Sequence, residues 1–145
     1  MLAAGLRNLL VSRMTEARRA GVDEREATDM PINILLLDDS KVARMQARRV
    51  IAEAAPDAVV TDTDNFERFF ELAASTAFDL VLIDYNMPNE NGLALAERLK
   101  ATQPTLRMAL LTANIQESIV QRAQAMGLAF LPKPLRPDAI RSLIG

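Results

Sequence analysis

The sequence predicts an α/β fold with a doubly wound, parallel sheet of five strands and helices on both faces. From Met30 onward, short β-rich runs alternate with helical patterns about five times within roughly 115 residues. The run INILLL at 32–37 is almost continuously apolar, which is typical of a strand buried on both faces. Crossovers between parallel strands are right-handed, so successive helices cover both faces of the sheet.

Each element has its own signal in the sequence. Ser40 is placed to cap a first helix, on which Val42, Met45, Val50 and Ile51 recur at helical intervals. The elements that follow are expected as strand 58–61, helix 64–74, strand 80–83, helix 93–102, strand 107–111, helix 116–126, strand 129–131 and a last short helix that Pro137 opens.

Residues 1–28 differ from the rest of the chain. Leu2, Leu6, Leu9 and Leu10 fall on one face at about 3.6 residues per turn. The segment 21–29 that follows is charged and poor in apolar residues. We therefore expect an N-terminal amphipathic helix with its linker over 1–28, and one domain over 31–145.

Composition excludes several classes of function. The chain has no cysteine, so it forms no disulfides and no thiolate metal site, which fits the cytoplasm. It also has no histidine, which excludes imidazole zinc sites and Ser-His-Asp hydrolysis. The net charge of −2 provides no basic field for nucleic acid, and no apolar stretch suits a membrane. We expect neither nucleic acid nor membrane as a partner.

Polar residues follow four of the five predicted strands. Asp38 and Asp39 follow the first strand, Asp84 the third, Thr112 the fourth and Lys133 the fifth. Ligands of doubly wound folds bind at this end of the strands. Three carboxylates gathered there repel one another, and Mg²⁺, which prefers oxygen ligands, would relieve the repulsion. An aspartate can also act as a nucleophile towards phosphate, and a lysine and a hydroxyl can bind its oxygens.

Each of these residues has a plainer explanation when it is taken alone. The acids at 38 and 39 could cap a helix, the acid at 84 could stabilise a turn, and Thr112 could cap the next helix. Lys133 could be a solvated loop charge. Their joint position at strand ends favours one shared site.

Four motifs in this order resemble those of the response-regulator receiver domain. They are LLLDDS at 35–40, DYNMP at 84–88 with Gly92 beyond it, LTA at 111–113 and FLPKP at 130–134. The resemblance covers residues 31–145. It implies a flavodoxin-like sheet with strand order 2-1-3-4-5 and a cis peptide bond between Lys133 and Pro134.

The resemblance also implies a role for each matching position. Asp84 corresponds to the phosphoacceptor, Thr112 and Lys133 to the two residues that bind the phosphate, and Phe130 to an aromatic switch residue that acts with Thr112. The implied Mg²⁺ ligands are Asp38, Asp39, Asp84 and the backbone carbonyl of Asn86.

The implied function is that of a phosphoacceptor in a two-component phosphorelay. A histidine kinase or histidine phosphotransfer protein would donate its phosphoryl group to Asp84 in the presence of Mg²⁺. Contacts with a downstream protein, or with a second copy, would then change at the face built from the fourth helix, fifth strand and fifth helix. Apart from self-catalysed phosphorylation and dephosphorylation, no enzyme activity is expected. Lys41, Arg44, Arg48 and Arg49 give the first helix a basic face that is either simply solvated or docks an acidic partner.

Three alternatives remain at this point. The chain could be the receiver piece of a larger response regulator, because its last helix is short for the family; otherwise it is a stand-alone receiver. It could be a small phosphatase that depends on Mg²⁺ and aspartate, although those enzymes place two acids two positions apart, whereas 38 and 39 are adjacent. It could also be a docking module that needs no phosphate, but such receivers usually lack part of the acidic set.

Overall fold

The computed structural model describes residues 31–144, so the helix and linker predicted for residues 1–28 lie outside the described residues. Within 31–144, one parallel sheet has the strand order β2-β1-β3-β4-β5, which confirms the predicted fold and order. The strands are β1 Asn33–Leu37, β2 Val59–Thr63, β3 Leu80–Asp84, β4 Arg107–Thr112 and β5 Ala129–Pro132. The helices are α3 Lys41–Ala54, α4 Phe66–Ser75, α5 Gly92–Thr102, α6 Glu117–Ala125 and α7 Pro137–Ile144.

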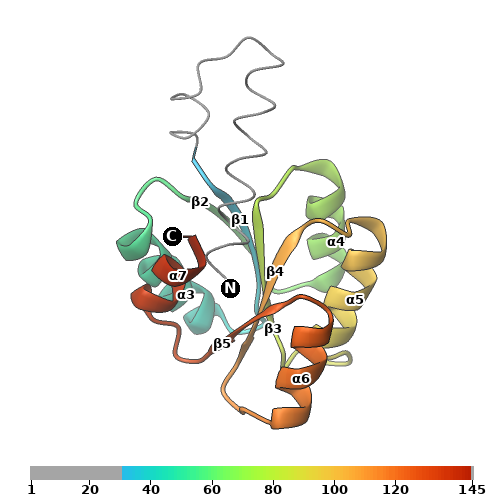
Figure 1. The fold of residues 1–145 in the computed structure, drawn as a ribbon. Helices are drawn as coiled ribbons and strands as arrows, with labels where there is room; N and C mark the ends of the chain where they lie inside the picture. The colour runs from blue at the N-terminus through green and yellow to red at the C-terminus, as the bar shows by residue number, and fades with distance from the viewer. Residues whose placement is uncertain (1–30, 145) are drawn as a thin grey trace.

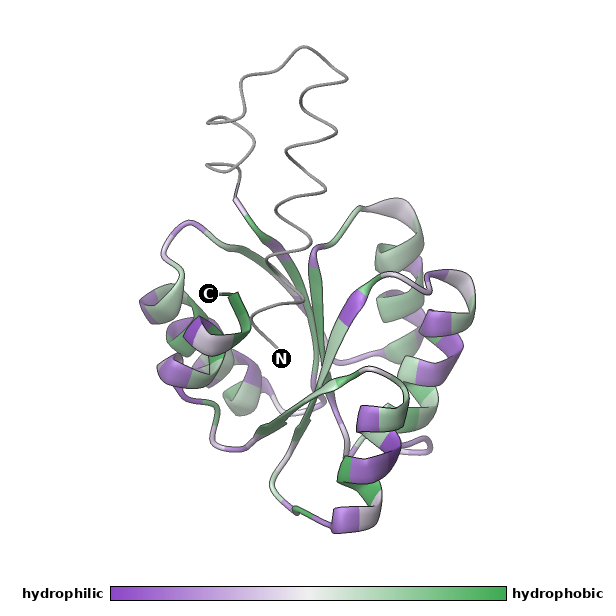
Figure 2. Cartoon of the chain, viewed as in Figure 1, coloured by the Kyte–Doolittle hydropathy of each residue, from purple (hydrophilic) through white to green (hydrophobic). Residues whose placement is uncertain are grey.

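The helices cover the sheet in two layers (Figure 1). Helices α3 and α7 lie on one face, and α4, α5 and α6 lie on the other. Each face has its own apolar core, because alternate residues of the central strands point to opposite sides: Leu35 and Leu37 belong to the α4–α6 side, and Leu36 to the α3–α7 side. Figure 2 shows the hydrophobic strands between helices whose outer faces are hydrophilic. The polar residues of the motifs lie at the carboxyl ends of the strands.

Strand β2 differs most from its predicted bounds. It begins one residue later and ends two residues later than expected, at Thr63. Its pairing with β1 continues through Leu36 opposite Asp62 and Leu37 opposite Thr63. The ladder with β1 overrides the polar character of this stretch, and Asp62 therefore lies in the sheet rather than in a loop.

Helix α3 buries a narrower stripe than its apolar pattern suggested. Ala47 and Ile51 are buried, but Val42 and Met45 are 63% and 56% exposed. At about 100° per residue these two lie roughly 140–160° around the helix from Ala47, on the side away from the sheet. The helical spacing correctly predicted a helix here, but the four apolar residues that recur on it do not form one buried stripe. Ser40 is confirmed as the N-cap, and its hydroxyl accepts a hydrogen bond from the Ala43 N–H at 3.2 Å.

Helix α5 begins directly against the end of β3. The Gly92 N–H donates to the Tyr85 carbonyl at 2.8 Å, and a Cβ at Gly92 would lie 2.3 Å from the Asp84 carbonyl oxygen. Asn91 caps the helix by accepting from the Ala94 N–H at 2.9 Å. The position of the Asp84 backbone therefore depends on the absence of a side chain at residue 92.

We expect Gly92→Ala to lower the free energy of unfolding by about 1–3 kcal/mol, the usual cost of forcing a carbon into packed space. It should also shift the fluorescence of Tyr85, the chain's one tyrosine in the absence of tryptophan. Urea denaturation followed by circular dichroism measures the first effect. In the comparison variant Gly127→Ala, the φ of +73° is unfavourable but the new Cβ meets only the Lys100 Nζ at 3.5 Å. That variant should leave Tyr85 emission unchanged, and an equal change in both variants would contradict the close approach at Gly92.

Candidate functional site

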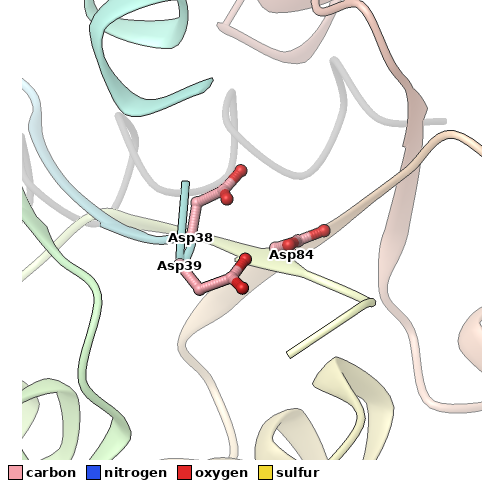
Figure 3. Close-up of side chains that lie close together, drawn as sticks. All are labelled: Asp38, Asp39 and Asp84. Atoms are coloured by element: carbon pink, nitrogen blue, oxygen red, sulfur yellow. The ribbon is translucent and has the colours of Figure 1, made fainter. Parts of the chain in front are cut away.

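Three carboxylates meet at the carboxyl end of the sheet. Asp38 and Asp39 follow β1, Asp84 ends β3, and these two strands are neighbours. One oxygen from each of the three lies within 4.8 Å of the others. Figure 3 shows the three side chains close together. Asp38 and Asp84 are buried, whereas Asp39 is exposed. The structure thus brings the predicted acids together with one side open to solvent.

Lys133 supplies the positive charge of this cluster. Its Nζ lies 2.8 Å from Asp38 Oδ2 and 3.1 Å from Asp84 Oδ1. The Lys133 N–H donates to the Thr112 carbonyl at 2.8 Å, which holds the end of β5 against that of β4. The bond between Lys133 and Pro134 is cis, as expected. A single ammonium group therefore bridges two of the three acids.

The electrostatics of the cluster favour neutralisation of Asp84. Burial, and then the neighbouring charge of Asp38, raise the pKa of Asp84; Lys133 and the Asn86 N–H offset only part of this effect. Burial alone would lower the pKa of Lys133, but its hydrogen bonds and ion pairs with Asp38 and Asp84 outweigh burial and raise it. Lys133 therefore stays charged, and one ammonium does not balance the three acids.

Thr112 and Asn86 lie beside the cluster, and of the two only Asn86 bonds to one of its carboxylates. The Thr112 hydroxyl is fully buried and bonds within its own loop, donating to the Asn114 carbonyl and accepting from the Asn114 N–H, both at 3.1 Å. It does not cap α6, whose N-cap is Gln116. The Asn86 N–H donates to Asp84 Oδ1 at 3.3 Å.

Phe130 lies in β5 opposite Leu110 of β4. It is half-buried and packs against the apolar core on the α4–α6 side of the sheet. Its ring therefore lies close to the surface of the domain, where a change of side-chain position would alter that surface.

The donor set at this edge fits a small divalent cation. All three acids offer carboxylate oxygens, which Mg²⁺ prefers, and the exposed Asp39 leaves room for the waters that Mg²⁺ retains. An oxygen-lined acidic pocket beside a lysine is suited to phosphoryl transfer onto a carboxylate.

The sequence did not reveal the partner of the basic residues on α3. Arg44 and Arg48 both form ion pairs with Asp62, so they are not simply the solvated or docking face that was expected. Asp62 was missed because strand β2 was expected to end at Thr61. The spacing of Arg44 and Arg48, four residues apart on one helical face, was the available signal.

Comparison with known proteins agrees with this geometry. The profile of the response regulator receiver domain matches residues 34–145. The chain is 34% identical over 120 residues to the cyclic di-GMP phosphodiesterase response regulator RpfG of Xanthomonas campestris. The aligned region covers 81% of this chain and 32% of that protein. The chain is 32% identical over 109 residues to the nitrate/nitrite response regulator NarL of Escherichia coli, with 74% of this chain and 50% of that protein covered. The chain thus spans about a third to a half of these relatives.

Solved structures share the fold. The chemotaxis protein CheY4 of Vibrio cholerae superposes with a TM-score of 0.68 at 21% identity, covering 77% of this chain and 93% of that one. A signal receiver domain of an HD domain-containing protein from Pseudomonas fluorescens gives 0.68 at 22% identity, covering 79% and 87%. On its fold, its acidic pocket and its matching profile, the chain belongs to the response regulator receiver domain family, the signalling domain of two-component systems.

Proposed function

We propose that Asp84 accepts a phosphoryl group from a phosphohistidine on a separate protein, and that this transfer switches the protein contacts of the domain. The observation that carries the proposal is the cluster of Asp38, Asp39 and Asp84 bridged by Lys133 at the open edge of the sheet. The 145 residues contain no histidine, so a phosphohistidine donor has to lie outside them.

In the proposed reaction, a carboxylate oxygen of Asp84 attacks phosphorus. The new O–P bond forms as the P–N bond to the donor imidazole breaks, and the imidazole keeps the electron pair and takes up a proton. Lys133 is already 3.1 Å from Asp84 Oδ1, so its ammonium can follow a phosphate oxygen. The result is an acyl phosphate on Asp84.

We assign the Mg²⁺ ligands to Asp38, Asp39, Asp84 and the backbone carbonyl of Asn86. When bound, the ion would neutralise the acidic cluster and the charge of the transferred group. Asp38 and Asp84 are held by Lys133 and by backbone N–H groups, including that of Ser40 at 3.0 Å from Asp38 Oδ1. These contacts keep the buried acids aimed at the pocket.

Thr112 and Phe130 form the proposed switch. The Thr112 hydroxyl would exchange its two bonds to Asn114 for one to phosphate, and Phe130 would then turn inward. This change would alter the face made by α6, β5 and α7, where a downstream protein or a second copy would bind. Moving such an equilibrium from mostly inactive to mostly active needs about 5.5 kcal/mol of differential stabilisation. Several charge-assisted hydrogen bonds can supply that amount.

The proposed donor is a histidine kinase or phosphotransfer protein. A cleft of about 510 Å³ beside the site supports access by another protein, since it is lined by α3 residues such as Gln46 and Arg49 and reaches Asp38 and Lys133. In residues 31–144 no helix is long and apolar enough to cross a membrane. The cytoplasmic location stays a prediction, and so does a role limited to signalling.

Asp84→Asn should abolish labelling by acetyl phosphate in Mg²⁺, because the amide is not a nucleophile. Phosphate-affinity gel electrophoresis and intact-mass spectrometry measure the label. Asp57→Asn changes an exposed acid in the loop between α3 and β2 and should leave labelling unchanged. An unlabelled wild type, or steady turnover of p-nitrophenyl phosphate, would contradict the proposal, and the second result would favour a phosphatase.

Asp84→Asn should also raise the stability of the metal-free protein at pH 7, because the amide removes a buried charge beside Asp38. The pKa of Asp84 is raised in the folded state, so the folded protein binds the proton more tightly than the unfolded chain does. Its contribution to stability is therefore lost as the pH rises from the ordinary value of 3.8 through the folded-state pKa. Mg²⁺ should stabilise the wild type more than Asp84→Asn. Thermal unfolding at pH 4 and pH 7 with and without Mg²⁺ tests this, with Asp57→Asn as the control.

Thr112→Ala should retain beryllofluoride binding but lose the response of the distant face. Its hydroxyl is the group that would leave Asn114 for the phosphate, whereas Thr112→Ser keeps a hydroxyl. Amide chemical shifts of α6, β5 and α7 on beryllofluoride addition report the response. The receiver domain of DrrB from Thermotoga maritima has been solved in a beryllofluoride-activated form. This chain shares its fold with a TM-score of 0.66 at 23% identity, covering 78% of this chain and 93% of that one. Full responses in Thr112→Ala would refute the proposed switch.

A further inference from the structure

Two guanidinium groups of α3 bind one carboxylate of β2, but they differ in one contact. Arg44 Nε donates to Asp62 Oδ2 at 2.8 Å and Arg48 Nε donates to Asp62 Oδ1 at 2.9 Å. Arg44 also donates from Nη1 to the backbone carbonyl of Asp38 at 2.9 Å. Of these two arginines, Arg44 therefore joins β2 to the acidic pocket, and Arg48 binds Asp62 alone.

The Asp38 carbonyl belongs to the peptide group that leads into Asp39. The Asp38 N–H is itself held by the Thr63 carbonyl at 3.2 Å, so both polar backbone atoms of Asp38 have partners. A peptide group is planar, and fixing its oxygen therefore fixes the direction in which the chain enters Asp39. Within residues 31–144, no hydrogen bond or ion pair to another side chain holds the exposed Asp39 carboxylate. Its orientation depends on the backbone.

We propose that Arg44, anchored by Asp62, is a positioning residue that fixes the Asp38–Asp39 peptide and so aims the Asp39 carboxylate at the Mg²⁺ site. The inference rests on the proposed function, because it assigns to Arg44 a role in the binding of that ion. The hydrogen bonds of the Arg44 side chain go to Asp62 and to the Asp38 carbonyl, not to the carboxylates proposed to bind the ion. Arg44 acts through the backbone of a ligand, as the outer contacts of metal sites commonly do.

Burial distinguishes Arg44 from its neighbour. The Arg44 side chain is 15% exposed and that of Asp62 is 22% exposed, whereas Arg48 is 45% exposed. The position of Asp62 in β2 explains the anchoring, since it pairs with Leu36 and therefore points to the face that α3 covers. Burial alone would raise the pKa of Asp62, but the hydrogen bonds and charges of Arg48 and Arg44 outweigh burial and lower it. The anchor therefore remains ionised at neutral pH.

Charge and position have opposite consequences for Mg²⁺ at this residue. A positive side chain near the pocket repels a cation, so removing its charge alone would tighten binding. Removing the hydrogen bond to the Asp38 carbonyl would release Asp39 and weaken binding. Arg44→Lys keeps the charge but loses the guanidinium geometry that reaches both oxygens. Arg44→Met removes both the charge and the hydrogen bond.

The experiment measures the Mg²⁺ dissociation constant of the full chain by isothermal titration calorimetry. We expect Arg44→Lys and Arg44→Met to weaken binding about tenfold, the lower end of the range for outer contacts of metal ligands. The matched variant Arg48→Lys loses the guanidinium hydrogen bonds to the same carboxylate, and Arg48→Met loses the ion pair as well. Neither variant changes a contact with Asp38, so both should stay within about twofold of the wild type. Thermal unfolding without metal shows whether the two sets differ in stability.

A second readout needs no metal. The amide nitrogen shift of Asp39 responds to hydrogen bonding at the preceding carbonyl, so it should move in the Arg44 variants and stay in place in the Arg48 variants. Equal Mg²⁺ affinity in Arg44→Lys and Arg48→Lys, or tighter binding in Arg44→Met than in the wild type, would overturn the inference. A wild type that fails to bind Mg²⁺ would instead overturn the proposed function.

Discussion

Repulsion among three carboxylates at one edge of the sheet is the constraint on which the rest of the structure depends. Asp38 and Asp84 are buried beside each other, and a single ammonium, that of Lys133, bridges them. Burial and the neighbouring Asp38 raise the pKa of Asp84, and Lys133 offsets only part of this effect. The site is therefore short of positive charge before any ion binds. Such a shortage favours a divalent cation, and the charge of that ion would in turn offset the negative charge of a transferred phosphate.

The surrounding fold resists relaxation of this cluster. Parallel pairing of β1 with β3 keeps the two buried acids adjacent, and helix α5 begins so close to Asp84 that a side chain at Gly92 would meet its carbonyl. On the other side, Arg44 and Asp62 hold the Asp38 backbone. These contacts come from both layers of helices. The acids are consequently kept near one another at a cost that the two apolar cores offset.

The same arrangement explains how a local reaction could reach a distant surface. Thr112 and Lys133 are joined through the backbone hydrogen bond at the ends of β4 and β5, and Phe130 lies in the latter strand. Within residues 31–144 the Thr112 hydroxyl bonds to Asn114, and the proposed phosphate on Asp84 would compete for it as a stronger acceptor. Coupling between the site and the distant surface would then need a change of hydrogen-bond partners at Thr112 rather than a new fold.

The sequence by itself determined the succession of strands and helices along the chain. It also placed Asp38, Asp39, Asp84 and Lys133 together at the carboxyl end of the sheet. It could do so because alternation of buried strands with helices, together with the fixed handedness of crossovers, leaves few arrangements. Only the tertiary structure decided which residues on α3 face outward, how far β2 extends, and that Arg44 and Arg48 share Asp62. Those features depend on pairing between segments distant in the chain. Pairing with β1 keeps the polar residue Asp62 in strand β2, and the local pattern of apolar residues does not reveal that pairing.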